Sequence, residues 1–136
     1  MLVDRIVPML RSWFLAHGQG LVAAYLFGSV ARGQERADSD VDIGIVLGRP
    51  FGPSLEDLDR LAGMQQELAD LLSREVDLVP LDSASPDLRH NVLVDQVLLY
   101  DGDHDARVEF EIRTRNDYAD HLPFLLAYRR AVLRRA

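Results

Sequence analysis

The sequence predicts an α/β (α+β) fold in which a small mixed β-sheet has helices packed on it. Short apolar runs rich in β-branched residues alternate with longer segments whose apolar residues recur at helical spacing. The chain has 136 residues, of which 48% are hydrophobic and 27% are charged, as expected for one globular domain. Alternating strands and helices are typical of a sheet covered by helices.

The N-terminal segments are predicted to form a helix, a strand and a short helical turn. Residues 2–16 have apolar positions at helical spacing, although Pro8 is expected to kink that helix. The apolar run at 21–27 predicts the first strand, and residues 29–32 are predicted to form a helical turn after it.

The central segments continue the alternation. Residues 41–47 are rich in β-branched side chains and predict a second strand, which the loop at 48–54 ends. A helix is predicted over 55–73, with Ser54 as its N-cap and Gly63 as a weak point in its interior.

The C-terminal part is predicted to add two strands and two helical segments. The strands are residues 76–81 and 97–100, and a helix near 87–94 lies between them. Residues 105–136 are expected to be a C-terminal helical segment of the single domain 1–136, kinked or divided at Pro123.

The C-terminal segment combines apolar and basic residues. Residues 107–135 hold seven of the 15 arginines, so this segment is a candidate docking surface, with a solvated helix face as an equal alternative. Its apolar side chains are expected to pack on the sheet, and a partner surface is the alternative. They are Tyr118, Leu122, Leu125, Leu126, Tyr128, Val132 and Leu133.

The bulk composition excludes several classes of function. The formal net charge is −7, which argues against direct nucleic-acid binding, since that needs a basic surface. Apolar runs are too short to span a membrane, and the N-terminus does not read as a signal peptide. The absence of cysteine fits a cytoplasmic protein.

An aspartate pair stands at the start of the strand predicted at 41–47. Asp40 and Asp42 are separated by one residue, and residues i and i+2 of a strand point to the same side. Two neighbouring carboxylates repel each other unless a cation lies between them. Mg²⁺ takes oxygen ligands, usually one or two carboxylates with water and substrate phosphates. The pair therefore predicts a divalent-cation site.

A glycine–serine pair upstream supplies a candidate phosphate-binding turn. Gly28 and Ser29 follow the first predicted strand; glycine lets a ligand approach, and helix-start N–H groups and a hydroxyl can bind anions. Arg32 could contact a phosphate, although an exposed loop arginine or a local ion pair is the favoured alternative. Asp77 stands alone in the apolar strand at 76–81 and could reach the same site if that strand neighbours 41–47.

Together these residues resemble the motif of nucleotidyltransferases of the DNA polymerase beta superfamily. That motif is Gly-Ser, a short spacer, Asp-x-Asp and a third Asp on a later strand. Here it reads Gly28-Ser29, then Asp40-Val41-Asp42, then Asp77. Over roughly residues 5–120 the chain is similar to the minimal nucleotidyltransferases, many of which are antitoxins paired with a HEPN-domain ribonuclease toxin.

The resemblance implies a reaction and a role for each motif residue. AMP would pass from ATP to a tyrosine hydroxyl of a HEPN toxin, with two Mg²⁺ ions at the site. Gly28 and Ser29 would hold the triphosphate, and Asp40 and Asp42 would hold the ions. Asp77 would help position one ion and take the proton of the attacking hydroxyl.

Two other functions stay open at this point. One is nucleotidyl transfer to a small-molecule hydroxyl such as that of an aminoglycoside, which usually needs an extra helical domain or a dimer. The other is an antitoxin that neutralises its partner by binding alone.

Overall fold

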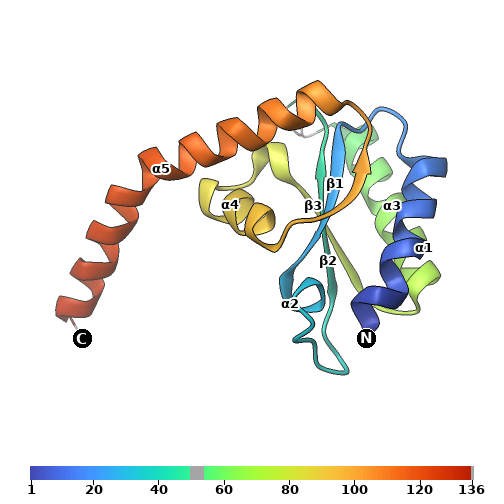
Figure 1. Ribbon diagram of the computed structural model, residues 1–136, viewed down its shortest axis with the longest axis horizontal. Helices are drawn as coiled ribbons and strands as arrows, with labels where there is room; N and C mark the ends of the chain where they lie inside the picture. Colours follow the sequence, from blue (N-terminus) through green and yellow to red (C-terminus); the bar gives the residue numbers. More distant parts are fainter. Residues whose placement is uncertain (50–53, 136) are drawn as a thin grey trace.

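A four-stranded mixed β-sheet forms the centre of the structure, a computed structural model that describes residues 1–49 and 54–135 (Figure 1). The strand order is β3-β2-β1-β4; β1 is antiparallel to both of its neighbours, and β2 is parallel to β3. The four predicted strands are confirmed, with ends that differ by one or two residues. They are β1 (Ala23–Phe27), β2 (Val41–Val46), β3 (Val76–Pro80) and β4 (Val97–Asp101).

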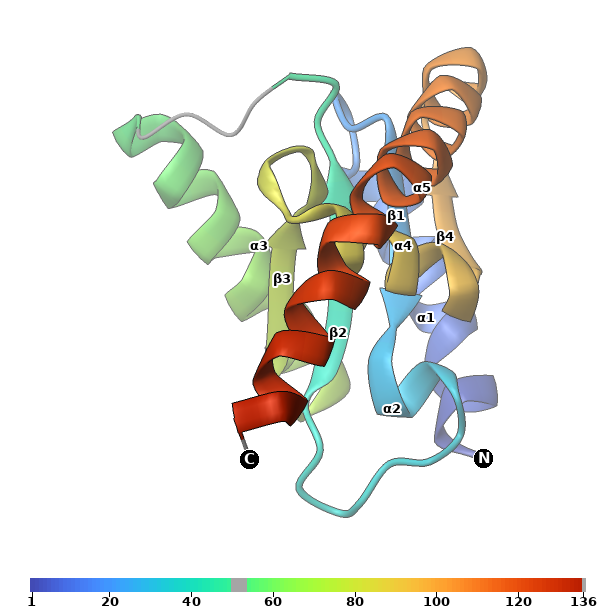
Figure 2. The ribbon, with the colours of Figure 1, turned by 90° about the vertical axis from the view of Figure 1, so that its left-hand side faces the viewer.

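Helices cover both faces of the sheet (Figures 1 and 2). Helices α1 and α3 pack on one face, α4 and α5 lie on the other, and α2 is a short turn at the end of β1. The helices are α1 (Leu2–His17), α2 (Gly28–Ala31), α3 (Leu55–Leu72), α4 (Pro86–Asp95) and α5 (His104–Arg135), with one 3₁₀ turn, η1 (Leu81–Ser83). The α/β arrangement predicted from the sequence is therefore confirmed.

The strands alternate between two separate cores, as their side-chain period of two requires. Ile43 and Ile45 of β2 pack into the core under α1 and α3, together with Leu26 of β1. The residues between them face the other way, so Asp42 and Gly44 lie on the face that α4 and η1 cover. This alternation decides on which side of the sheet the carboxylate of Asp42 emerges.

Helix α1 is held by one buried stripe. Ile6, Leu10 and Phe14 recur at helical spacing, and each is at most 2% exposed. Pro8 lies inside α1 without interrupting it, and the helix ends at Gly18, whose N–H donates to the carbonyl of Phe14.

Helix α3 begins as predicted. The Ser54 hydroxyl accepts a hydrogen bond from the backbone N–H of Asp57, so Ser54 is the N-cap. Met64 and Leu68 are the buried residues on the inner face of the helix. Of the loop predicted at 48–54, residues 50–53 lie outside the described part of the chain.

Helix α5 differs most from its prediction. It runs as one helix through Pro123, and Figure 1 shows a bend in its course, so of the predicted kink or division the structure has the kink, as an internal proline causes. Near its start Phe110 is buried, but Tyr128 and Leu133 near its end are 69% and 75% exposed. The expectation that these apolar residues form core is therefore wrong for the end of the helix, which nothing on the sheet reaches. No helix of residues 1–49 and 54–135 could cross a membrane.

The position of Gly44 generates a stability prediction. A Cβ atom at Gly44 would lie 2.7 Å from Cδ1 and 2.9 Å from Cγ of Leu81, which is fully buried and has no room to move away. We expect Gly44→Ala to lower the free energy of unfolding by about 1–3 kcal/mol, measured by urea denaturation, because the β2–η1 contact becomes overpacked.

Gly63 provides the matched control. A Cβ at Gly63, in α3, would meet nothing within 4 Å. Gly63→Ala should therefore raise the free energy of unfolding by about 0.5–1 kcal/mol, through helix propensity alone. Equal effects of the two substitutions would contradict the packing argument.

Candidate active site

Two carboxylates meet where β2 and β3 begin. In the parallel pairing of these strands, Asp42 lies directly opposite Asp77, so both side chains emerge on the same face of the sheet. Asp42 is half-buried and Asp77 is exposed. The sequence predicted that Asp77 reaches the site if its strand neighbours the strand of Asp42. The two strands are neighbours.

The third carboxylate, Asp40, lies on the loop before β2. It is exposed, two residues before Asp42. Arg74 holds this loop from the turn before β3, since its guanidinium donates to the carbonyls of Ser39 at 2.7 Å and Ala37 at 3.1 Å. Arg74 therefore fixes the backbone from which Asp40 projects, a role that nothing in the local sequence pattern indicated.

Gly28 lies directly against Asp42. It has φ +80°, a conformation that favours glycine, and a Cβ there would lie 2.2 Å from Oδ2 of Asp42. Phe27 is the register partner of Asp42 on β1, so the Gly-Ser turn follows immediately beside the carboxylate. Ser29 is the second residue of α2 and is half-buried. The structure thus brings Gly28 to Asp42, and Ser29 follows it in the chain.

Asp95, the last residue of α4, joins this group and was not predicted. Its Oδ2 accepts a hydrogen bond from the Gly28 N–H at 2.8 Å and one from Arg32 Nη1 at 3.1 Å. The Asp95 side chain is 7% exposed, and that of Arg32 is 48% exposed. In the sequence Asp95 is one acidic residue within the mostly apolar run 92–99. Nothing in that pattern distinguishes it from an ordinary aspartate at the end of a helix.

The electrostatics of the group are repulsive. Burial raises the pKa of Asp42 above its ordinary value, and the negative charges of Asp77 and Asp40 raise it further, while Arg32 lowers it. A carboxyl group with such a pKa is destabilised in its charged form, and a bound cation would relieve that repulsion.

The donor set fits Mg²⁺ without forming a complete cage. Within residues 1–49 and 54–135, no group of three or more His, Cys, Asp or Glu side chains is placed so that it could by itself hold a metal ion. Mg²⁺ does not require one, because it keeps several waters and usually binds one or two carboxylates together with substrate phosphates. Asp42 and Asp77 present such a pair, opposite each other on one face of the sheet, and this pairing of two oxygen donors supports the fit.

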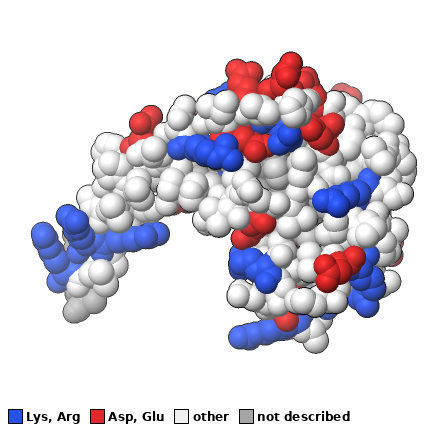
Figure 3. Space-filling view, in the orientation of Figure 1, with Lys and Arg blue, Asp and Glu red and all other residues white. Residues whose placement is uncertain are grey.

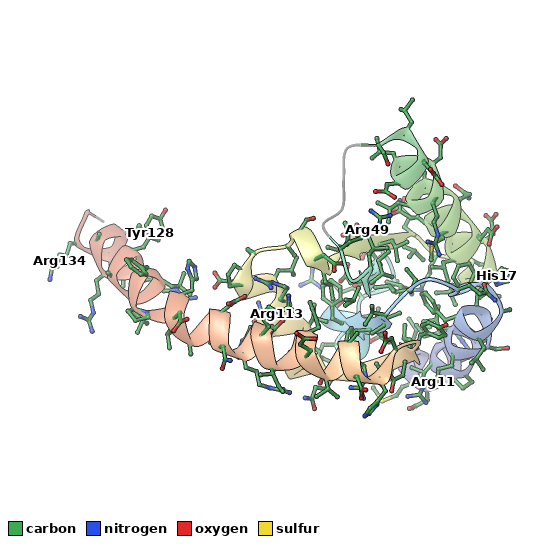
Figure 4. All side chains as sticks on the ribbon, turned by 90° about the horizontal axis from the view of Figure 1, so that it is seen from above. Arg11, His17, Arg49, Arg113, Tyr128 and Arg134 are labelled. Carbon is green, nitrogen blue, oxygen red and sulfur yellow. The ribbon has the colours of Figure 1, made fainter. Side chains whose placement is uncertain are left out.

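The site is open rather than enclosed. Asp40 and Asp77 are exposed, whereas a cavity of about 260 Å³ lies at the other end of β2, beside Val46 and Gly48. Arg49 and Arg113 line that cavity, and Figure 4 shows both well apart from Arg134 at the end of α5. An open site suits a large acceptor better than a small one that a pocket would enclose.

Comparisons with known proteins agree with this geometry. The sequence profile of the family described as Polymerase beta, Nucleotidyltransferase matches residues 13–105, a range that contains every carboxylate discussed above. MJ0435 of Methanocaldococcus jannaschii, a candidate protein adenylyltransferase, is 38% identical over 93 residues, which are 68% of this chain and 88% of that protein.

Two further relatives match more of the chain. Protein adenylyltransferase MntA of Shewanella oneidensis is 33% identical over 117 residues, covering 85% of this chain and 76% of that protein. A chain from a crystal structure of a toxin–antitoxin with AMP-PNP is 28% identical with a TM-score of 0.65, and the match covers 98% of this chain and 96% of that chain.

The charge cluster generates a pH prediction. The pKa of Asp42 is raised, so the folded protein binds this proton more tightly than the unfolded chain, and ionisation of Asp42 lowers stability as the pH rises through its pKa. We expect Asp77→Asn to bring the pKa of Asp42 down towards its ordinary value, followed by NMR of the side-chain carboxyl carbon.

The control is an aspartate elsewhere on the surface. Asp59→Asn, on the exposed side of α3, should leave the Asp42 titration unchanged. If Asp77→Asn and Asp59→Asn gave the same titration of Asp42, the two carboxylates would not be coupled.

Asp95 generates a separate stability prediction. Asp95→Ala removes the acceptor of the Gly28 N–H and the partner of Arg32, so we expect the free energy of unfolding to fall by about 1–3 kcal/mol in urea denaturation. Asp95→Asn, which keeps an acceptor oxygen, should recover most of the loss. Equal stability of the alanine variant and the native protein would show that these hydrogen bonds contribute nothing.

Proposed function

The chain belongs to the polymerase beta nucleotidyltransferase family, and from this we propose that it transfers AMP from ATP to a hydroxyl of a HEPN-type toxin, acting as its antitoxin. The observation that carries the proposal is the in-register pair Asp42 and Asp77 beside the Gly28 turn. That arrangement supplies metal-binding carboxylates next to a turn at which a triphosphate can lie.

The motif residues take the following roles in the proposal. Asp40, Asp42 and Asp77 would hold two Mg²⁺ ions, and these ions would supply positive charge that stabilises the attacking and leaving oxygens. Gly28 and Ser29 position the triphosphate, and Arg32, already held beside them by Asp95, donates to a phosphate oxygen.

The chemical step is a substitution at the α-phosphorus of ATP. The acceptor oxygen, a tyrosine hydroxyl in the proposal, forms a bond to that phosphorus, and the bond to the departing pyrophosphate breaks. Asp77 is exposed at the open side of the group and accepts the hydroxyl proton. The half-buried Asp42 lies against Gly28 and is better placed to bind a metal ion than to contact the acceptor.

The nature of the acceptor follows from the open site and from the relatives. The relatives MJ0435 and MntA carry names that assign them to protein adenylyltransferases, and the toxin–antitoxin chain matches 98% of this chain. AMP-PNP in that toxin–antitoxin structure supports an adenine nucleotide as the donor. The cytoplasm, where ATP is made, is the compartment in which this reaction would run.

Intact-mass spectrometry tests the proposal. The HEPN-type protein from the same genome is incubated with this protein, ATP and Mg²⁺, and we expect its mass to rise by one or more AMP units. The double substitution Asp40→Asn with Asp42→Asn should leave the mass unchanged, because it keeps the side-chain shapes but removes the charges that bind the metal ions.

Two controls separate transfer from the other functions. Excess EDTA should stop the mass increase with the native protein. If the toxin were neutralised with no change in mass, or if the double variant neutralised it equally well, binding alone would be the mechanism and the proposal would fail.

A further inference from the structure

The end of α5 extends beyond the rest of the protein. We call residues 124–134 the tail; Figures 1 and 3 show it as an arm that leaves the sheet and its other helices. The last ion pairs between α5 and α4 are Arg89 with Asp117 and Asp87 with His121. Beyond these contacts the tail has no neighbouring element in the described part of the chain to pack against.

One face of the tail continues the buried face of α5. Phe110 and Thr114, at 7% and 0% exposure, face the body, and the same helical face returns at Leu125, Tyr128 and Val132. We call these last three residues the tail face. Tyr128 is 69% and Val132 is 48% exposed. The face is covered by α4 through Asp117 and His121, and beyond them it carries apolar side chains that nothing in the described chain covers, which is typical of a helix that packs against a partner.

The tail face borders the same side of the sheet as the carboxylates. Asp42 lies on the face that α4 and α5 cover, and Figures 1 and 2 place the tail level with the end of the sheet where β2 begins. Figure 3 shows the surface hollowed between the tail and the body. A protein that presents a hydroxyl to Asp77 from this side would lie in that hollow, beside the tail.

The charge of the tail indicates which kind of protein surface would bind in the hollow. Arg129, Arg130 and Arg134 lie on the tail, and Figure 3 shows the blue residues gathered at its end. Tyr128 and Arg134 are both labelled on this arm in Figure 4. The chain as a whole carries a net charge of −7, so this basic end differs from the rest and favours an acidic partner.

We propose that the tail face is the docking surface for the acceptor protein, which lies in the hollow with an apolar strip against Leu125, Tyr128 and Val132 and acidic side chains beside the tail arginines. This inference rests on the proposed function, since it assigns the surface that holds the substrate of that reaction. The nucleotidyltransferase match ends at residue 105, so the tail lies outside the part that carries the chemistry. Docking and transfer are therefore separable.

A pair of double variants tests the proposal. Tyr128→Glu with Val132→Glu places two charges on the tail face, and Leu126→Glu with Leu133→Glu places two on another side of the same helix. Leu126 and Leu133 are 43% and 75% exposed apolar residues of the tail, so the control pair is matched in location and added charge. Circular dichroism and urea denaturation confirm that both variants are folded.

The expected result is a loss of affinity confined to the tail face. Titration calorimetry with the separately purified HEPN-type protein from the same genome should show binding about 30-fold or more weaker for the tail-face variant, as for the loss of central apolar contacts. The control variant should bind like the native chain. AMP transfer by the tail-face variant should fall at limiting partner and recover at high partner concentration, since the carboxylates are unchanged.

Three outcomes would overturn the proposal. The tail-face variant could bind as tightly as the native chain, or both variants could lose affinity equally. Size-exclusion chromatography could instead show a native dimer that the tail-face variant breaks without loss of partner binding, which would assign the face to a second copy. If the native chain transferred no AMP but only the tail-face variant lost affinity, the docking surface would stand and the proposed reaction would fall.

Discussion

The parallel pairing of β2 with β3 places Asp42 and Asp77 opposite each other, and the surrounding structure depends on holding this repulsive pair in place. Burial and two neighbouring carboxylates raise the pKa of Asp42, so the folded protein destabilises the charged form of this side chain. Gly28 is present because any side chain there would displace the Asp42 carboxylate. Gly44, two residues further along β2, admits Leu81 of η1 beneath the same face. Gly28 and Gly44 therefore leave the space that Asp42 and Leu81 occupy on this face of the sheet.

Two residues outside the motif connect it to the rest of the fold. Arg74 holds the loop that carries Asp40, and Asp95 holds both Gly28 and Arg32. Asp95 binds the backbone of the glycine turn, and Arg74 binds the backbone of the loop before Asp40. The position of the carboxylates relative to the glycine turn therefore depends on α4, which carries Asp95, and on the turn between α3 and β3, which carries Arg74. Helix α4 packs on α5, which links the site to the helix that ends in the tail.

Much of this structure could be predicted from the sequence, for physical reasons that also explain the failures. The β-branched run of β2 and the Ser54 cap act locally, so their patterns were sufficient. Asp42 and Asp77 come together only because β2 and β3 are neighbours. The sequence pattern does not determine strand order, so the prediction for Asp77 was conditional on it. Asp95 could not be identified, because its role arises only when α4 packs beside β1. The apolar spacing of α5 was correct, but spacing does not say which molecule covers a helix face.

The hydrogen bond from Gly28 to Asp95 joins residues that are 67 positions apart in the chain. A ribosome makes Gly28, Asp42 and Asp77 before it makes Asp95, and the N-terminal part of a chain emerges first. The nascent chain therefore exposes the glycine turn and the carboxylates while the acceptor of the Gly28 N–H is still missing. The order of synthesis therefore delays the hydrogen bond that holds the Gly28 turn until α4 has left the ribosome.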